Sequence, residues 1–552
     1  MSLPNFSTQS TLFSTAALST NLFPETDTYR LFARLIYPRL AAVRVQLEEC
    51  YCVANGRIAI EPVLLLGVSL LQYLEGQPDR AAVEMLRYHA GWNFALNRQL
   101  GEELFHPTTL VNFRQRLIAH GLSALGFEAI LDGLVEAGLV ARQGRQRLDS
   151  TQMFGRISRM SRLENVRETL RLALEELTGV SRSLSCPEFW PQLWERYVEN
   201  KLDYRTESGV LREKMILAGV DAAQLLEWVR GLSDQGPAGG EQVRLLERVW
   251  RENFEFDPAG QCQQRQAQPP GAVHNPHDAE AQWAAKGQGK QKKEHVGYKV
   301  QVAESVSQKE LAKGEPTQNF ITAMVTQPAI ASDEAGLALV EKEQAEMGLK
   351  KATHLYVDGA YVSAEKLAQA QAEGQQIIGP AQPAPRKEGR FSAEDFQITV
   401  EERKAVCPAG KESTQCSRLE EEATGKVSYR FEFSTQCRDC PLRAQCLGKD
   451  QPHRTLTVGQ YHTHLQARRQ EQKTEEFKKE AQHRNAIEGT QSELVRAHGL
   501  RRARSRGLAK ARLQNYLIGA ACNIKRWIRR QVWNLEQAMV DGDLNGEPVA
   551  VN

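Results

Sequence analysis

The stretch His295–Ala303, HVGYKVQVA, alternates apolar and polar residues with period two, which predicts a β-strand. A second strand-like run is Phe320–Val325 (FITAMV), and a third candidate, Arg145–Ser150 (RQRLDS), comes earlier in the chain. Further along we expect a helix over 333–347, a strand at 354–357, a helix over 363–373 and a strand at 376–379. Strands and helices in this order predict an α/β domain built on a mixed sheet.

The order strand, hairpin, helix, strand, helix, strand is that of a ribonuclease-H-like core, a mixed sheet with flanking helices. The other segments have a different periodicity. Helical spacing from Asp27 to Gly138 predicts an all-α N-terminal domain, and amphipathic runs between Leu163 and Glu255 predict a helical insert. One long helix is expected from about His464 to His498. The expected domains are a flexible leader at 1–26, a helical N-terminal domain at 27–140, a catalytic core at 141–162, 274–380 and 461–530, a helical insert and linker at 163–273, a cysteine-rich zinc insert at 381–460 and an acidic tail at 531–552.

Composition limits the class of protein. The chain has 552 residues, of which 41% are hydrophobic, so it is long enough for several buried cores. The longest apolar stretch, Val63–Leu74, is shorter than the roughly 18 residues of a membrane helix. The first charged residue is Glu25, so the basic start of a signal peptide is missing. We therefore expect a cytoplasmic protein with no membrane partner. The formal net charge of +2, taken alone, argues against a nucleic-acid partner. A total can hide local blocks of charge, however, so it does not exclude one.

Three acidic residues occupy marked positions. Asp149 ends the first strand candidate, Asp358 follows the strand at 354–357, and Glu488 lies on the late helix. Any one of these acidic residues could simply cap a helix or lie on a solvated face. In this order along the chain, however, the three would meet at one end of a ribonuclease-H-like sheet. Carboxylates grouped in this way hold Mg²⁺. Two such ions activate an attacking oxygen and stabilise a leaving oxygen at phosphorus.

Arg484 lies four residues before Glu488, so the two side chains face the same way on a helix. Two interpretations are open. Arg484 contacts a scissile phosphate or orients a carboxylate, or it forms an ordinary surface pair with Glu488.

Five of the ten cysteines fall within forty residues. Cys407, the pair Cys437 and Cys440, and Cys446 have the spacing of a tetrahedral zinc site. Cys416 is an alternative to Cys407, His453 is a weaker candidate, and unpaired buried cysteines are the ordinary explanation. Four thiolates leave no open position on the metal, so this zinc would be structural.

Basic residues gather near the three acids in sequence. Between Glu493 and Glu536 there is no acid, whereas a solvated helix face normally mixes both signs of charge. Phosphate neutralisation explains such a block and makes binding salt-dependent. A helix containing Arg114 and Arg116 is also a candidate for reading DNA. The predicted DNA-binding residues are Arg114, Arg116, Lys290, Lys292, Lys293, Lys299, Arg484, Arg501, Arg502, Arg504, Arg506, Lys510 and Arg512.

Taken together, these motifs resemble the DDE transposases of bacterial insertion sequences, of the IS-eleven-eighty-two type with an InsH-like N-terminal domain. Residues 61–117 resemble that domain, and 274–300 resemble the family's stretch between its first two acids. Asp149, Asp358 and Glu488 fall where the family has its D, D and E, and 484–527 resembles its Glu helix and the basic run that follows. Ala481 and Val495 depart from the family's Tyr and Tyr/Lys, which weakens a role for those two positions in handling DNA ends.

The resemblance implies a bacterial, nucleoid-associated enzyme that cleaves insertion-sequence ends and joins them to target DNA. Two Mg²⁺ ions, which Mn²⁺ can replace, would be held by the three acids, and one structural Zn²⁺ by the cysteines. The expected partners are double-stranded DNA and a second copy of the chain in a synaptic complex. Two other functions are open: a catalytically silent DNA-binding protein, and a nuclease that cuts without joining. The helical insert is either a dimerisation or end-binding element or a packing element only.

Overall fold

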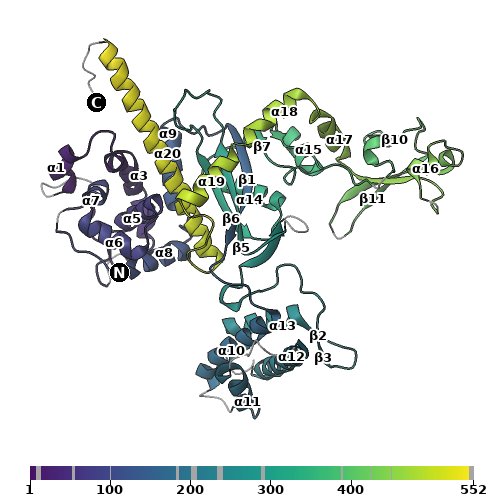
Figure 1. The fold of residues 1–552 in the computed structure, drawn as a ribbon, viewed down its shortest axis with the longest axis horizontal. Coiled ribbons are helices and arrows are strands. Elements are labelled where there is room, and N and C mark those ends of the chain that lie inside the picture. The colour runs from purple at the N-terminus through teal and green to yellow at the C-terminus, as the bar shows by residue number, and fades with distance from the viewer. Residues whose placement is uncertain are drawn as a thin grey trace.

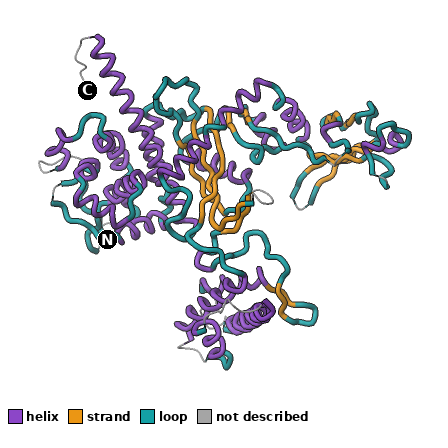
Figure 2. Tube along the Cα trace, viewed as in Figure 1, coloured by secondary structure: helices purple, strands orange, loops and turns teal. Residues whose placement is uncertain are grey.

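A six-stranded mixed sheet lies at the centre of the computed structural model, with helices on both of its faces (Figures 1 and 2). Its strands are β1 (Arg145–Phe154), β4 (Gln282–Lys286), β5 (Lys293–Ser305), β6 (Ile321–Pro328), β7 (His354–Tyr356) and β8 (Gln376–Ile378). The structure describes residues 1–7, 14–52, 56–99, 101–181, 186–200, 208–232, 240–286, 292–386, 389–422, 424–448 and 450–545. The expected α/β class with a mixed sheet is confirmed.

Strand direction changes at β1. β1 pairs antiparallel with β5, and β5 pairs antiparallel with β6 and with β4. On its other side β1 pairs parallel with β7, which in turn pairs parallel with β8. The main path of the sheet is therefore β6-β5-β1-β7-β8, with β4 added beside the start of β5. β1 is longer than expected because β5 pairs with it as far as Phe154.

Alternate residues of the central strands enter two different cores. Tyr298, Val300 and Val302 of β5 pack in the core that also contains the N-terminal helices. Leu148 of β1 and Ala303 of β5 enter a second core, on the opposite face. That face is covered by α14 (Asp333–Glu346) and α15 (Ala364–Ala372), which supply Leu337, Val340 and Leu367. The period-two alternation in the sequence thus reflects a sheet buried on both sides.

Helix α20 (Leu508–Asn545) joins the N-terminal helices to the sheet. It packs on β6 and also on α5 (Pro62–Glu75) and α9 (Leu125–Glu136), so the N-terminal helices and one face of the sheet share a single core. The other N-terminal elements are α1 (Thr15–Ser19), η1 (Thr20–Leu22), α2 (Thr28–Leu31), η2 (Phe32–Ile36), α3 (Tyr37–Ala42), α4 (Arg44–Glu48), α6 (Asp79–Tyr88), α7 (Ala90–Ala95) and α8 (Thr108–Ala119). None of the described helices is long and apolar enough to cross a membrane.

The leader expected to be flexible over 1–26 is partly ordered by contacts with the helical domain. Ser14 caps α1, its Oγ accepting a hydrogen bond of 3.1 Å from the Ala17 amide. The Thr15 amide donates to the Arg98 carbonyl oxygen at 2.9 Å. Residues 15–22 of the expected leader are thus helical, and a serine N-cap and a tertiary backbone contact hold this segment.

Two inserts project from the sheet in different directions (Figure 1). The helical insert has its own apolar core. Its elements are α10 (Arg162–Ser181), α11 (Trp190–Trp194), η3 (Glu195–Glu199), α12 (Ser208–Gly231), α13 (Glu241–Asn253), β2 (Phe254–Phe256) and β3 (Cys262–Gln264), and η5 (Pro276–Asp278) follows it. The cysteine-rich insert also has a small core of its own. Its elements are η7 (Ala393–Asp395), β9 (Gln397–Thr399), β10 (Lys404–Val406), β11 (Gln415–Glu420), β12 (Val427–Glu432), η8 (Ser434–Cys437), α16 (Arg443–Cys446) and β13 (Thr455–Gly459).

The single helix expected over 464–498 is wrong. The chain forms α17 (His462–Glu471), α18 (Glu475–Ala481), η9 (Gln482–Arg484) and α19 (Ile487–Ala497) instead. Thr474 starts a new helix because its Oγ1 accepts a hydrogen bond of 3.3 Å from the Phe477 amide. The acidic tail expected over 531–552 is helical as far as Asn545, as the end of α20, and 546–552 lie outside the described residues.

Candidate active site and metal-binding residues

Two of the three candidate acids lie side by side because of the parallel pairing of β1 with β7. The last paired residues are Arg147 on β1 and Tyr356 on β7. Asp149 lies two residues further along β1, which continues to Phe154, so it does not end the strand as expected. Asp358 lies two residues beyond Tyr356, after β7 has ended. Since parallel strands run in the same direction, both carboxylates reach the same edge of the sheet. The structure thus brings the side chains of Asp149 and Asp358 together.

A single guanidinium group connects the two aspartates. Arg484 Nη2 lies 3.0 Å from Asp149 Oδ2 and 4.0 Å from Asp358 Oδ2. Burial raises the pKa of the Asp149 carboxyl, Arg484 opposes that rise, and the neighbouring Asp358 adds to it. Of the two interpretations of Arg484, the structure favours contact with carboxylates over a surface pair with Glu488. The cation balances two acids that would otherwise repel each other.

Glu488 lies beside β1 but is exposed to solvent. It is in the first turn of α19, and α19 packs against β1. Gln491, one turn further along, donates from Nε2 to the Ser150 carbonyl oxygen at 3.4 Å. Residues three apart share a helix face, so Glu488 lies on the side of α19 that faces Ser150 of β1. Among the described residues, no hydrogen bond or ion pair joins Glu488 to either aspartate.

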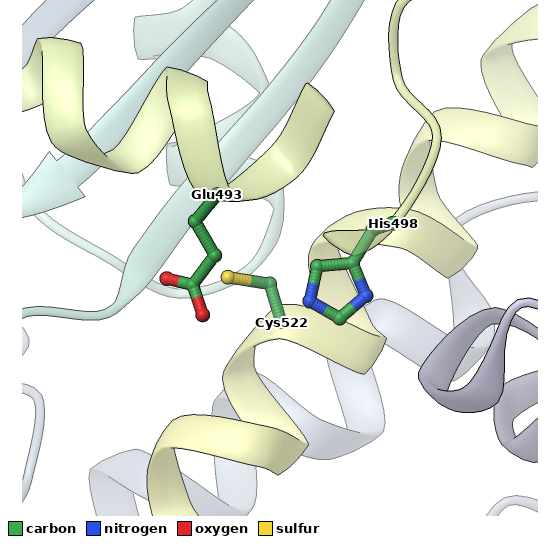
Figure 3. A group of neighbouring side chains, drawn as sticks. All are labelled: Glu493, His498 and Cys522. Atoms are coloured by element: carbon green, nitrogen blue, oxygen red, sulfur yellow. The ribbon is translucent and has the colours of Figure 1, made fainter. Parts of the chain in front are cut away.

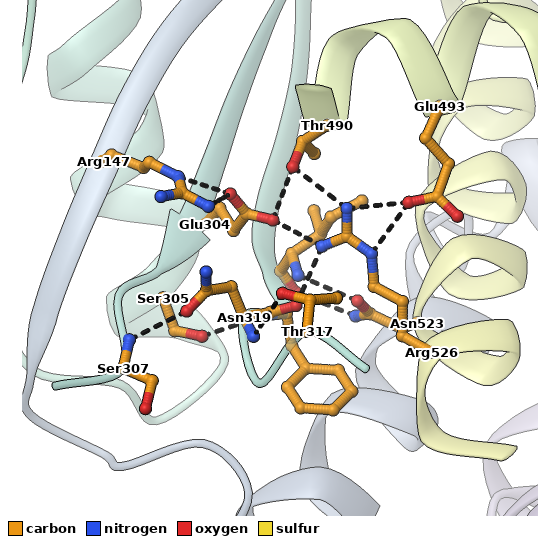
Figure 4. A network of polar contacts seen from close by, with 12 residues as sticks. Arg147, Glu304, Ser305, Ser307, Thr317, Asn319, Thr490, Glu493, Asn523 and Arg526 are labelled. Carbon is orange, nitrogen blue, oxygen red and sulfur yellow. Dashed lines mark hydrogen bonds and ion pairs between the residues drawn. The ribbon is translucent and has the colours of Figure 1, made fainter. Parts of the chain in front are cut away.

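The position of α19 is fixed by a buried polar network around Glu304 of β5 (Figure 4). The Glu304 side chain has no exposed surface. Its Oε2 accepts a hydrogen bond of 2.5 Å from Arg147 Nε, and its Oε1 accepts one of 2.7 Å from Thr490 Oγ1 and another from Arg526 Nη1. Thr490 is two residues after Glu488, so this carboxylate connects the strand of Asp149 to the helix of Glu488.

Helix α20 completes the network. Arg526 donates from Nη2 to Thr490 Oγ1 at 3.0 Å, and from Nε and Nη2 to Glu493 Oε2 at 3.0 and 2.9 Å. One turn earlier, Asn523 bonds both the amide and the carbonyl of Ile321 on β6, at 2.8 and 2.9 Å. Sequence reasoning did not identify this network. A charged residue at position 304 of an alternating strand would normally be taken as solvent-exposed. The residues near it in the sequence give no sign of its buried partners.

Four of the predicted zinc ligands surround one small cavity. Cys407, Cys437, Cys440 and Cys446 all line a space of about 20 Å³, which is about the size that holds one water molecule. Burial raises the pKa of the Cys446 thiol, Arg454 opposes the rise, and the other three cysteines add to it. The Arg454 amide lies 3.5 Å from Cys437 Sγ, where it would donate to a thiolate. Cys416 lies on β11 and does not line this cavity, and His453 lies 3.9 Å from Glu432. Four thiols are the donor type that a structural zinc ion takes.

The predicted DNA-binding residues fall into two groups. Arg502, Arg506, Lys510 and Arg512 are exposed, before and within the first turns of α20. Arg504 and Lys510 line a groove of about 610 Å³ between that segment and the N-terminal helices, and Arg114 and Arg156 line it as well. This basic groove, as we call it, therefore brings together arginines from three distant parts of the sequence. Arg114 also pairs with Asp79, which lines the same groove.

The other predicted DNA contacts have partners within the protein or lie elsewhere. Lys299 Nζ donates to the Ala331 carbonyl oxygen at 2.7 Å, and Arg501 Nη1 donates to the Gln152 carbonyl oxygen at 3.1 Å. Arg116 stacks on the Tyr51 ring at 4.7 Å, and Lys292 pairs with Glu294 at 2.8 Å. Lys293 is exposed at the start of β5, and Lys290 lies outside the described residues.

Two protein-family models match the chain. The family described as "Transposase DDE domain" matches residues 406–528, and the family described as "Transposase domain (DUF772)" matches residues 19–116. The first range contains Glu488 and the four cysteines of the cavity, whereas Asp149 and Asp358 lie outside it. No curated protein matches the chain. Together the two matches indicate a DDE-type transposase, as expected from the sequence, and the IS-eleven-eighty-two type stays a prediction.

Replacing Thr490 with valine, which has nearly the same shape, tests the polar network. Thr490→Val leaves Glu304 and Arg526 buried without the hydroxyl that joins them. We expect the apparent free energy of unfolding to fall by about 1–3 kcal/mol, measured by urea denaturation. Thr463→Val on α17, whose hydroxyl makes longer contacts of 3.3 Å with Glu401, is the matched control and should change it by less than about 0.5 kcal/mol. Equal effects of the two changes would contradict a special role for Thr490.

Proposed function

We propose that this transposase cleaves the ends of an insertion sequence and joins them to target DNA by metal-dependent chemistry at Asp149, Asp358 and Glu488. The observation that carries the proposal is the shared contact of Asp149 and Asp358 with Arg484, just past the last residues that pair in parallel between β1 and β7. Both carboxylates lie close enough to share one cation. A divalent metal ion needs oxygen ligands arranged in that way.

We infer that the catalytic core is ribonuclease-H-like. Support comes from the strand path β6-β5-β1-β7-β8, in which the first three strands form antiparallel pairs and the last three run parallel. Such a sheet places the ends of its central strand and the next parallel strand together. Asp149 lies within β1 and Asp358 lies just after β7, each two residues past the last parallel pair, and the exposed Glu488 approaches from a helix packed on β1.

The proposed ligands of two Mg²⁺ ions, or of Mn²⁺ in their place, are Asp149, Asp358 and Glu488. When bound, such ions activate an attacking oxygen and stabilise the leaving oxygen of a phosphodiester. The protein's own part is positional. The pairing of β1 with β7 sets the spacing of the two aspartates, and the Glu304 network holds α19 against β1. Arg484 contacts both carboxylates, and its guanidinium would be placed to contact a phosphate oxygen if metal ions were held by the aspartates.

The basic groove is the proposed path for the DNA of an element end. Arg504 and Lys510 come from the segment after α19, and Arg114 comes from the N-terminal helix α8. DNA lying there would touch both matched regions of the chain at once. Because two ends must be joined in one reaction, we expect a homodimer in the synaptic complex.

The cysteine cavity is the proposed site of one structural zinc ion. Its four thiol side chains come from a small insert in which the strands are short and the apolar core is limited. Metal binding then supplies folding free energy that such a core lacks.

The first test replaces one carboxylate with a side chain that cannot bind metal. Asp358→Ala should lower both strand cleavage and strand joining by about a thousandfold or more, while binding to element ends persists. The assay follows labelled end DNA in the presence of Mg²⁺ and a target plasmid. Asp450→Ala, on an exposed loop, is the matched control and should react like the parent chain.

The outcomes of this assay also separate the other candidate functions. Equal loss of end binding in Asp358→Ala would contradict the assignment of that residue. Parent protein that binds ends but never cuts them would be a silent DNA-binding protein. Parent protein that cuts without producing joined molecules would be a nuclease.

A second test addresses the basic groove. Each phosphate contact that is removed lowers the salt dependence of binding, by about 0.9 in the slope of log K against log salt. Arg156→Ala combined with Lys510→Ala, which changes two exposed residues that line the groove, should therefore lower that slope by about 2, measured by fluorescence anisotropy over a salt series. Lys313→Ala combined with Lys342→Ala removes the same charge from exposed positions elsewhere and should leave the slope unchanged.

A further inference from the structure

A third group of potential metal ligands lies outside both the carboxylate site and the cysteine cavity. Glu493 is on α19, His498 directly follows α19, and Cys522 is on α20 (Figure 3). One ligand atom from each of the three lies within 4.8 Å of the others. In Figure 3 the Cys522 sulfur lies between the Glu493 carboxylate and the His498 ring. The three side chains therefore converge from two helices and the turn between them.

His498 is oriented as histidine ligands of metals are. Its Nδ1 lies 3.1 Å from the Tyr73 carbonyl oxygen, so Nδ1 carries the proton and donates it there. This leaves a lone pair on Nε2. The side chain is 2% exposed, and Nε2 has no hydrogen-bond partner among the described residues. Metal-bound histidines commonly donate their other ring N–H to a backbone carbonyl in this way. An unpartnered buried nitrogen is otherwise costly.

Cys522 has no exposed surface. Buried cysteines usually behave as small apolar residues. Here, however, one neighbour of the sulfur is a nitrogen with a free lone pair and another is a carboxylate. A thiol, an imidazole nitrogen and a carboxylate oxygen are the three ligand types that zinc binds in proteins.

Glu493 already has cationic partners, so it can bind a metal ion only if its carboxylate has a lone pair that these partners do not use. Oε2 accepts the two hydrogen bonds from Arg526, and Oε1 lies 3.3 Å from Lys525 Nζ. A carboxylate offers about four lone-pair directions. These three contacts leave one direction free, so Glu493 can bind a metal ion without releasing Arg526.

We propose that Glu493, His498 and Cys522 bind a zinc ion. The ion would join α19 to α20, and through the His498–Tyr73 hydrogen bond it would also hold both to α5 of the N-terminal helices. Its role is structural, because it lies within the packed core and not at the edge where Asp149 and Asp358 meet. This site depends neither on the transposition chemistry nor on the cysteine cavity.

The zinc content of the purified full-length chain tests the proposal. Protein is expressed with zinc in the medium, dialysed, and assayed by inductively coupled plasma mass spectrometry. Cys522→Ser and His498→Gln should each lower the content by one ion per chain relative to the parent. Cys440→Ser removes a ligand of the other cavity, so combining it with Cys522→Ser separates the two contributions. Cys50→Ser and His462→Gln are matched controls, since both change buried residues elsewhere and should not alter the content.

Folded Cys522→Ser or His498→Gln protein that keeps the parent zinc content would overturn the proposal. If these buried changes prevent folding, Glu493→Gln supplies the second measurement, because the Glu493 side chain is 21% exposed. In a competition series with a chelator, the variant site should bind zinc at least about tenfold more weakly than the parent site does. A release curve that superimposes on the parent curve would equally contradict the site.

Discussion

The carboxylate of Glu304 is the interaction on which the candidate active site depends. It has no exposed surface, and it accepts hydrogen bonds from Arg147 on its own sheet, Thr490 on α19 and Arg526 on α20. Removing one partner from a buried ionic network of this kind leaves a charge uncompensated, at a typical cost of about 3–5 kcal/mol. The network therefore selects one arrangement of strand and helices, whatever its net contribution to stability.

That arrangement determines where the acids lie. Arg147 and Asp149 are two residues apart on β1, so their side chains project from the same face of the strand. Thr490 and Glu488 are two residues apart on α19, so the contact of Thr490 fixes the position of the turn that carries Glu488. The contacts of Glu304 therefore set the distance between the strand that carries one acid and the helix that carries another. The third acid, Asp358, is placed independently by the pairing of β7 with β1.

The two inserts and the proposed zinc sites lie outside this central arrangement but adjoin it. The helical and cysteine-rich inserts each have a separate apolar core. Glu493 links the buried network to the His498 and Cys522 group, because the same carboxylate that pairs with Arg526 faces Cys522 (Figures 3 and 4). A metal ion there would help to hold α19 in place near the end of the helix opposite to Glu488.

The sequence predicted local features well and distant contacts poorly. Strands near residues 145, 295, 320, 354 and 376 were predictable because their periodicity or apolar content is local. The break of the late helix at Thr474 was missed because helix-favouring residues on both sides hide a single capping residue. Glu304 could not be recognised, since its partners Arg147 and Arg526 are 157 and 222 residues away in the chain. The ordered segment at 14–22 was missed for the same reason, because its contact with Arg98 is tertiary.

The most direct measurement of the central claim is manganese binding followed by electron paramagnetic resonance. Mn²⁺ is titrated into the full-length chain and into an Asp149→Asn, Asp358→Asn variant, both with the cysteines intact. If the two aspartates form the metal site, the parent chain will bind Mn²⁺ and the variant will lose that binding while keeping its fold by circular dichroism. Equal Mn²⁺ binding by parent and variant would contradict the account.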